Sequence, residues 1–416
     1  MGSAPRGARC PGALKSLLGD RNYVVYALGN TVSSLGTWAQ RIGIGWLSWD
    51  LTHDATWVGI ISFAQLLPLI VLGPVFGALL DRHDHRRYAV TVNAVLAILA
   101  ALLYALTAAH HMNIFVLLSV AVLAGVANSA YQSARMAIVN DVVGLDKLPA
   151  AIAANSILFN LSRAVGPAIA GAIILHFGTE AVFAVNALSY AGIIASLLLV
   201  ELRVRRTQLA TGRSLLAESL EGLRYLRSHR ELQLLMLLSG VTSTLGRAIM
   251  ELLPAFADGI YKRGSLGLAN LTTAAGVGAI AGALLLSRYG AGDGLQRMTR
   301  LSTLLVGVTV AAFGLCADFR FALGVVGALG FVTVLSGVGQ QVLLQARVHD
   351  GYRGRVLGLW TAVNVAGPGL GSAATGYGSR LLGLKGATLV AGGLCLLLVF
   401  WLQLSHRRQD PGPPGS

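Results

Sequence analysis

The sequence has 416 residues, of which 55% are hydrophobic and only 12% are charged. Soluble proteins carry about 25% charged residues, so this composition excludes an ordinary soluble globular protein. The net charge of +14 is spread over short segments between apolar stretches and forms no single basic face, which argues against a nucleic-acid-binding protein.

The apolar stretches are each about 20 residues or longer, the length that crosses the ~30 Å hydrocarbon core of a bilayer. Because every backbone polar group in lipid needs an internal partner, we expect these stretches to be α-helices. Six of them precede a polar interval and six follow it. The predicted spans lie at about 22–49, 57–80, 88–108, 113–137, 150–176, 180–200, 231–256, 265–286, 298–316, 321–345, 354–380 and 387–404.

This pattern predicts an all-α membrane protein with twelve transmembrane helices in two six-helix bundles. We assign residues 1–200 to the N-terminal bundle, 201–230 to a cytoplasmic linker and 231–416 to the C-terminal bundle with a disordered tail. Leucines recur at helical spacing in the linker, so we expect an amphipathic helix there that lies at the membrane surface. These leucines are Leu216, Leu220, Leu223 and Leu226.

The distribution of lysine and arginine predicts the orientation in the membrane. If the N-terminus is inside, the inside segments hold 24 of the 32 basic residues and the outside segments hold five. Such an excess is typical of cytoplasmic loops, so we expect both termini in the cytoplasm. Arginine far outnumbers lysine, as in bacteria with GC-rich genomes, which favours the bacterial inner membrane.

Short segments of the two halves resemble each other in the same order along the chain. LGNTVSSLG (28–36) aligns with LSGVTSTLG (238–246) at an offset of 210, and AVGPAIAG (164–171) aligns with VAGPGLGS (365–372) at an offset of 201. GALLDR (77–82) returns as GALLLS 205 positions later. Two six-span halves with the same direction fit parallel repeats related by an axis along the membrane normal.

The loop after the second predicted span reads GALLDRHDHRRYAV, residues 77–90. Its glycine, its Asp-Arg pair and the two basic residues that follow resemble the loop signature of the major facilitator superfamily, and the resemblance covers nearly the whole chain. It implies a transporter that works by alternating access between its two bundles.

The same loop is predicted to be a conformational latch. A carboxylate near a helix N-terminus is favoured by the helix dipole, and neighbouring arginines can pair with it. The alternative is a solvated basic loop that serves only the orientation rule. Arg135 is assigned to the latch because the sequence places it at the end of span four, where Arg347 ends span ten. The predicted latch residues are Gly77, Asp81, Arg82, Arg86 and Arg135.

A narrower resemblance appears at ARMAIVNDVVGLDKLPAAIAANSILFNLSRAVGPAIAG (134–171) and RGRVLGLW (353–360). These segments are similar to the branch that includes enterobactin exporters and macrolide efflux proteins, which implies export. One feature differs from drug:proton antiporters, which carry an arginine about four residues before a glycine in span four. Here Ala121 stands before Gly125, so that proton-relay position is empty.

Three arginines and one glutamate lie well inside the predicted spans, away from their ends. A charge at the bilayer centre costs at least ~2.5 kcal/mol, so such side chains normally face a partner or water. Arg41 shares one helix face with Asn30 and Ser34, and we expect this face to line a cavity between the bundles. By this map Glu251 is the only acidic residue well inside a span, and the offset of 210 pairs it with Arg41.

An electropositive cavity suits an anionic or polyphenolic substrate, because arginine favours bidentate oxygen ligands. Aromatic side chains would offer ring faces to an aromatic substrate. The predicted substrate-binding residues are Arg41, Asn30, Ser34, Trp38, Tyr131, Asn160, Arg163, Gln341, Trp360 and Asn364.

Glu251 is the candidate for proton coupling, with Arg247 beside it, because a buried carboxylate near an arginine can load and release a proton as its surroundings change. The alternative is that Arg247 and Glu251, four apart on one helix, simply neutralise each other. Arg41 has the alternative of snorkelling to the outer headgroups. Arg163 has that of bonding backbone carbonyls at a nearby helix kink.

The sequence shows no metal-ligand cluster, no nucleotide-binding glycine loop with its lysine and no paired nucleophile and base. We therefore expect no enzymatic activity, no metal and no cofactor, with transport driven by a proton gradient. The favoured function is export of a siderophore-like anion or a hydrophobic drug by a monomer in the lipid bilayer. The alternatives are translocation of a lysophospholipid or another amphiphile, and a membrane sensor that binds a ligand without moving it.

Overall fold

The computed structural model describes residues 17–80, 83–144, 146–202, 215–288 and 292–409. Within these ranges the ordered elements are all helices, and none is a strand. The prediction of an all-α fold is therefore confirmed.

Six long helices form the first half of the chain, close to the predicted spans. Asp20, Asp84 and Asn113 each cap a helix by accepting a hydrogen bond from a backbone N–H in its first turn. Gly144 and Gly178 end two helices with φ of 73° and 85°, a conformation that favours glycine. The helices are α2 (Arg21–Thr52), α3 (Ala55–Leu80), α4 (His85–Ala108), α5 (Ile114–Val143), α6 (Leu148–Phe177) and α7 (Thr179–Leu199).

The second half begins with a short helix and continues through a broken span to five long helical arms. The last helix bends at Gly383, whose φ of 70° is not helical, so its residues 353–382 and 384–409 are two separate arms. The elements are α8 (Leu215–Ser228), α9 (Arg230–Val241), η1 (Thr242–Gly246), η2 (Arg247–Leu252), η3 (Ala255–Ile260), α10 (Gly264–Leu286), α11 (Asp293–Leu315), α12 (Phe319–Arg347), η4 (Asp350–Tyr352) and α13 (Arg353–Gln409).

Ten helical segments of the described residues are long and apolar enough to cross a membrane. One of them, Arg353–Ser405, contains both arms of α13. The 32-residue helix α2 is not among the ten. Adding α2 and counting the two arms of α13 separately gives the twelve spans that the sequence predicts.

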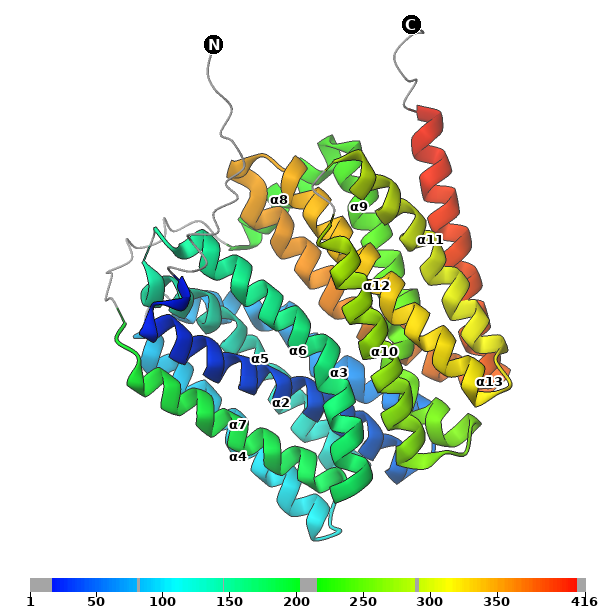
Figure 1. The fold of residues 1–416 in the computed structure, drawn as a ribbon, viewed down its shortest axis with the longest axis horizontal. Helices are drawn as coiled ribbons and strands as arrows, with labels where there is room; N and C mark the ends of the chain where they lie inside the picture. The colour runs from blue at the N-terminus through cyan, green and yellow to red at the C-terminus, as the bar shows by residue number, and fades with distance from the viewer. Residues whose placement is uncertain (1–16, 81–82, 145, 203–214, 289–291, 410–416) are drawn as a thin grey trace, which may run out of the picture.

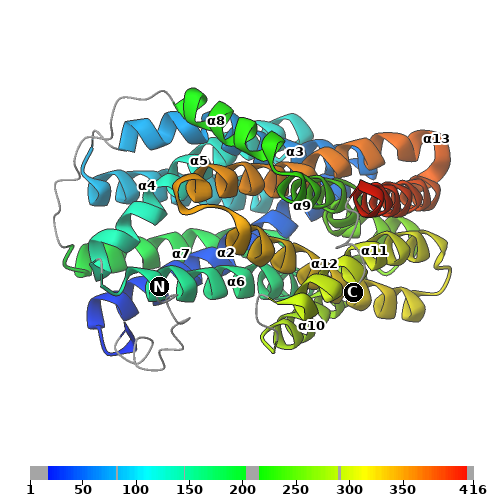
Figure 2. The same ribbon diagram turned by 90° about the horizontal axis from the view of Figure 1, so that it is seen from above.

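The helices separate into two groups in space. Helices α2–α7 form one group and α9–α13 the other (Figure 1), and in the view turned by 90° the first arm of α13 lies alongside α3 where the two groups meet (Figure 2). This arrangement is the predicted pair of six-helix bundles.

Helix α8 packs against the start of α13. The ring of Tyr225 stacks on that of Tyr352 with centroids 4.2 Å apart, and Arg355 Nη1 lies 3.1 Å from Glu221 Oε1. Leu226 is buried in this contact, whereas Leu223 is 39% exposed. Residues 203–214 of the predicted linker and 410–416 of the predicted tail lie outside the described part of the chain.

Two pairs of crossing helices hold the bundles together, α3 against α13 and α6 against α10. Small residues let the backbones approach closely. A Cβ on Gly59 would meet the backbone of Ser372, and a Cβ on Gly171 would meet the backbone of Ala269. The offset of 210 relates Gly59 to Ala269, and the offset of 201 relates Gly171 to Ser372. The second crossing is therefore the first one repeated by the internal symmetry.

Polar contacts between the bundles lie at the end opposite to the start of α2. Thr56 Oγ1 donates to the backbone oxygen of Gly376 at 3.1 Å. Arg380 Nη2 donates to Asp54 Oδ2 at 2.7 Å. We call this end of the molecule the far end.

Replacing Gly376 by leucine is expected to destabilise the protein, because its Cβ would meet the backbone of Ala55 in the α3–α13 crossing. Overpacking of this kind costs about 1–3 kcal/mol. The melting temperature of the purified protein should fall by several degrees. Gly393→Leu is the matched control, since Gly393 lies in the same helix with open space around it. Equal melting temperatures for the two variants would contradict the packing described here.

Candidate substrate and coupling site

Arg41 and Glu251 form an ion pair that joins the two bundles. Arg41 Nη2 donates to Glu251 Oε1 at 2.8 Å and Arg41 Nε donates to Oε2 at 3.1 Å, so the contact is bidentate. Each side chain is only 13% exposed. Bidentate contacts of this kind are among the strong hydrogen bonds of proteins. We call this contact the central ion pair.

The central ion pair joins two residues that the internal repeat treats as equivalent, since Glu251 follows Arg41 by 210 positions. A second contact lies beside it, because Trp49 Nε1 donates at 3.0 Å to Asp258 Oδ2, and a Cβ on Gly259, 210 positions after Trp49, would meet the Trp49 ring. Under two-fold symmetry, equivalent residues meet only at the axis. The pseudo-two-fold axis therefore passes between α2 and the seventh span.

Glu251 stands in an irregular stretch of helix. The seventh span changes from α9 to the π-helical η1, then to the 3-10 helix η2, and after Pro254 to the π-helical η3. In membranes, irregular backbone is tolerated where it is buried in protein or lines a cavity. Segments of π-helix are frequent at functional sites. The sequence predicts one span here and does not predict the breaks.

Two further arginines, Arg163 of α6 and Arg247 of η2, lie close enough to Arg41 for mutual repulsion. An asparagine of the same bundle holds each of them: Arg163 Nη2 donates to Asn160 Oδ1 and Arg247 Nη1 donates to Asn364 Oδ1, both at 2.9 Å. Within the described ranges, no carboxylate lies at ion-pair distance from these two arginines. Three arginines and one glutamate give this group a formal charge of +2, which favours an anion.

The other predicted residues of the first bundle lie at two positions along α2, one beside Arg41 and one nearer the start of the helix. The ring of Trp38 has its centroid 5.4 Å from Arg41 Cζ, so Trp38 belongs to the surroundings of the central ion pair. Tyr131 donates to Asn30 Oδ1 at 3.1 Å, and this contact lies about three turns nearer the start of α2. Ser34 is buried between these positions.

Asn364 is held by several contacts besides the one from Arg247. Its Nδ2 donates to Ser239 Oγ at 2.7 Å and to the backbone oxygen of Trp360 at 3.0 Å. The Trp360 side chain is buried in an apolar cluster of the second bundle, and its Nε1 has no hydrogen-bond partner there. Asn364 is therefore a well-anchored support for Arg247.

Gln341 is half-buried, while its neighbour Gln340 is fully enclosed between α11 and α12. Gln340 Nε2 donates to Thr303 Oγ1 and to Ser336 Oγ, both at 3.1 Å. The enclosed polar contact of this region thus belongs to Gln340.

The predicted latch lies only partly within the described residues. Asp81 and Arg82 fall outside them, and Gly77 has open space around its Cα. Arg86 donates to the backbone oxygen of Val200 at the end of α7, which is a contact within one bundle. The latch role of this loop stays a prediction.

The sequence gives Arg135 and Arg347 the same place in their bundles, and their contacts differ. Helix α5 continues to Val143, so Arg135 lies two turns inside the helix, with its Cζ 4.4 Å from the ring centroid of Phe159. Arg347 is the last residue of α12, and its Nε lies 3.5 Å from Glu231 Oε2. The prediction that Arg135 ends its span is wrong, because the helix runs farther than its apolar stretch.

Asp258 of η3 and Asp141 of α5 lie within helical segments but outside the predicted spans. Asp258 accepts from Trp49, and Asp141 Oδ2 lies 2.6 Å from His85 Nδ1. Asp258 follows Glu251 by seven residues and lies beyond the membrane-spanning candidate Arg230–Leu252. That spacing of two helical turns is the sequence signal that would have found Asp258.

A family model described as transmembrane secretion effector matches residues 18–410. The chain belongs to this family of the major facilitator superfamily. The resemblance predicted from the sequence is therefore confirmed, and the protein is a multi-pass membrane transporter.

Curated relatives share modest identity with this transporter over most of its length. The staphyloferrin A transporter of Staphylococcus aureus is 26% identical over 329 residues, which cover 78% of this chain and 81% of that protein. Macrolide efflux protein A of Streptococcus pyogenes is 22% identical over 386 residues, which cover 91% of this chain and 94% of that protein. The enterobactin exporter EntS of Escherichia coli is 28% identical over 287 residues, which cover 67% of this chain and 67% of that protein.

Solved transporters show the same fold. A bacterial homologue of the human lysosomal transporter Spinster, in an inward-facing and unoccupied conformation, matches with a TM-score of 0.67 and 14% identity, covering 97% of this chain and 100% of that one. The nucleoside transporter NupG matches with a TM-score of 0.68 and 13% identity, covering 93% and 99%. At identities this low, the structural likeness shows that the transporter shares the fold of these proteins and nothing more.

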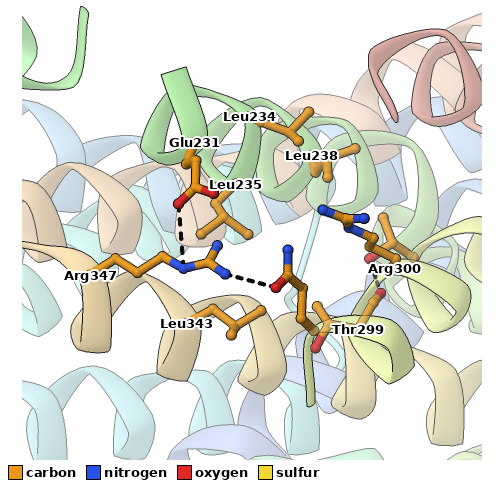
Figure 3. Close-up of a pocket in the computed structure, with 10 residues that line it drawn as sticks. Glu231, Leu234, Leu235, Leu238, Thr299, Arg300, Leu343 and Arg347 are labelled. Atoms are coloured by element: carbon orange, nitrogen blue, oxygen red, sulfur yellow. Dashed lines mark hydrogen bonds and ion pairs between the residues drawn. The ribbon is translucent and has the colours of Figure 1, made fainter. Parts of the chain in front are cut away.

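A small cavity of about 20 Å³ lies between α9, α11 and α12 of the transporter (Figure 3). Arg347 pairs there with Glu231 and donates to Gln296 Oε1 at 3.0 Å, and Arg300 also lines the cavity. A space of this size holds about one water molecule. It is too small for an organic substrate, and the central ion pair does not line it.

Breaking the central ion pair is expected to destabilise the transporter. Removing one partner of a buried pair costs about 3–5 kcal/mol, because the other charge stays buried without compensation. Arg41→Gln and Glu251→Gln should each lower the melting temperature strongly. The double variant should be more stable than the sum of the two effects predicts. Strictly additive effects would show that the two side chains do not interact.

Asp54 makes a second ion pair between the bundles, at the far end. Burial opposes its ionisation, but hydrogen bonds from Arg380 and Thr56 outweigh burial, so the pKa of the Asp54 carboxyl lies below its ordinary value. A carboxyl with a lowered pKa stabilises the native state above its ordinary pKa. This contribution is lost as the pH falls through the lowered value.

Asp54→Asn is therefore expected to lower the melting temperature slightly at neutral pH. The pair is partly exposed, so its contribution is at most about 1 kcal/mol. The difference between wild type and variant should be constant down to about pH 5 and shrink below about pH 4, as the wild-type carboxyl becomes protonated. Thermal melts of both proteins from acid to neutral pH measure this, and a difference independent of pH would contradict the assignment.

Proposed function

We propose that this transporter is a proton-coupled exporter of a small organic anion in the bacterial inner membrane. The central ion pair carries the proposal, because it places a carboxylate and a guanidinium from different bundles against each other inside the membrane. Export is the activity printed for the enterobactin exporter and the macrolide efflux protein among the relatives.

Alternating access requires the two bundles to separate first on one side and then on the other. In this structure the bundles meet at the far end, through Thr56 and Asp54, and through Trp49 beside the central ion pair. With both termini in the cytoplasm, as the basic residues predict, the far end is the outer face. The described state is then closed outside, and opening outward breaks the central ion pair.

Protonation of Glu251 would couple this opening to the proton gradient. A neutral Glu251 attracts the Arg41 guanidinium much less than a carboxylate does, because charge-assisted hydrogen bonds are about twice as strong as neutral ones. Protonation of Glu251 therefore weakens the contact between the bundles. Loss of the proton restores the ion pair and the closed outer side.

The charge balance of the site favours an anionic substrate. Arg163 and Arg247 come from different bundles, and no described carboxylate lies at ion-pair distance from either of them. An anion between them would contact both bundles and so respond to their movement. Among the two substrate classes that the sequence predicts, this favours the siderophore-like acid over the hydrophobic drug.

Transport in proteoliposomes with an imposed pH gradient tests the proposal. Enterobactin, staphyloferrin A and a macrolide are the probes. We expect the gradient to stimulate movement of at least one siderophore by wild type, and Glu251→Gln to abolish this stimulation while the siderophore still binds. Asp293→Asn is the matched control, because Asp293 is an exposed acidic residue at the start of α11.

Two results of this assay would contradict the proposal. A wild-type transport rate that does not depend on the pH gradient would rule out proton coupling. Gradient stimulation that survives in Glu251→Gln would show that another residue carries the proton.

A further inference from the structure

Four side chains of the first bundle form a row in which guanidinium groups and aromatic rings alternate. Arg41 Cζ lies 5.4 Å from the ring centroid of Trp38, and the Trp38 ring meets the Phe159 ring edge to face at 5.9 Å. Arg135 Cζ lies 4.4 Å from the Phe159 centroid. The row thus joins α2, α6 and α5, and we call it the arginine–ring row.

The row leads from the contact between the bundles toward the start of α2. At one end Arg41 holds Glu251 of the other bundle. At the other end, the backbone oxygen of Arg135 accepts from the hydroxyl of Tyr26, which lies in the second turn of α2. Phe159 precedes Arg163 by four residues on α6, so the row shares a helix face with one of the central arginines.

The members of the row are partly exposed and incompletely paired. All four residues are of intermediate exposure, and Arg41 exposes 13% of its side chain. In the described part of the chain, no carboxylate lies within ion-pair distance of Arg135, and its guanidinium meets a ring face instead.

Alternating cations and rings match a ligand that has both a ring and an oxyanion. Ring faces are electron-rich, so they attract guanidinium groups, and ring pairs prefer offset or edge-to-face contacts. An aromatic ring placed along the row meets both Trp38 and Phe159. Its carboxylate or phenolate oxygen meets one of the two guanidinium groups.

We infer that the arginine–ring row is the binding track for an aromatic anion, which moves along it between Arg135 and Arg41. The inference rests on the proposed function and narrows its substrate to a ring that bears a carboxylate or phenolate. At the Arg41 end, the oxyanion of the ligand competes with Glu251 for the same guanidinium. Arrival of the ligand therefore weakens the central ion pair.

Three matched compounds test the track with the full chain in lipid nanodiscs. The probe is 2-naphthoate, decahydro-2-naphthoate removes the aromatic ring system, and 2-naphthamide removes the charge. Titration calorimetry against empty nanodiscs should show that wild type binds 2-naphthoate about tenfold more tightly than either comparison compound.

Variants of Phe159 test whether the preference for 2-naphthoate depends on the arginine–ring row. Phe159→Leu should bring the affinity for 2-naphthoate down to that for the decahydro compound. Phe159→Tyr keeps a ring and should keep the preference, which excludes a folding defect as the cause. Phe177→Leu is the matched control, since Phe177 lies on the same helix with its side chain 72% exposed.

Equal wild-type affinity for the three compounds, or no binding of any of them, would overturn the track. An unchanged preference in Phe159→Leu would overturn it as well. Either result leaves the proposed exporter intact if the pH gradient still drives siderophore transport. A tenfold preference without gradient-driven transport supports the track and rejects the proton coupling.

Discussion

The central ion pair is the constraint on which the rest of this structure depends. Two charged groups inside a membrane are stable only when they face each other or water, because each one alone costs several kcal/mol. Arg41 and Glu251 satisfy each other through two hydrogen bonds, and they belong to different bundles. Every movement that separates the bundles at this level must first supply each charge with another partner.

The position of the pair on the pseudo-two-fold axis explains why so few residues control the contact. Duplication places equivalent residues face to face at the axis, so a single change of residue type in one half creates a complementary pair. Arginine faces glutamate at the axis, and a tryptophan lies against an aspartate beside it. Away from the axis, the same symmetry repeats a small-residue crossing, α3 on α13 and α6 on α10.

The chemistry of the site is less symmetric than its scaffold. The offset of 201 relates Arg163 of α6 to Asn364 of α13. Asn364 serves the second bundle as a support for Arg247, whereas Arg163 adds a charge in the first bundle. The arginine–ring row likewise belongs to the first bundle alone, so a ligand meets two different surfaces. A two-fold scaffold with unequal walls gives a ligand one preferred orientation.

The sequence alone determined the class of the protein, its twelve spans and its repeated halves. Span length, charge clustering and repeat offsets are local or periodic properties, and each follows directly from the order of residues. The offset even named Arg41 and Glu251 as equivalents. Only the tertiary structure decided that these equivalents touch, because contact depends on where the symmetry axis passes.

The tertiary structure also decided features that no sequence pattern predicts. The breaks of the seventh span, the extension of α5 beyond its apolar stretch and the pairing of Asp258 with Trp49 depend on neighbours far away in the chain. Phe159 looks like any apolar residue of a membrane helix until Trp38 and Arg135 are placed on either side of it. The sequence determines which groups a membrane can hold, and packing between helices decides which of them meet.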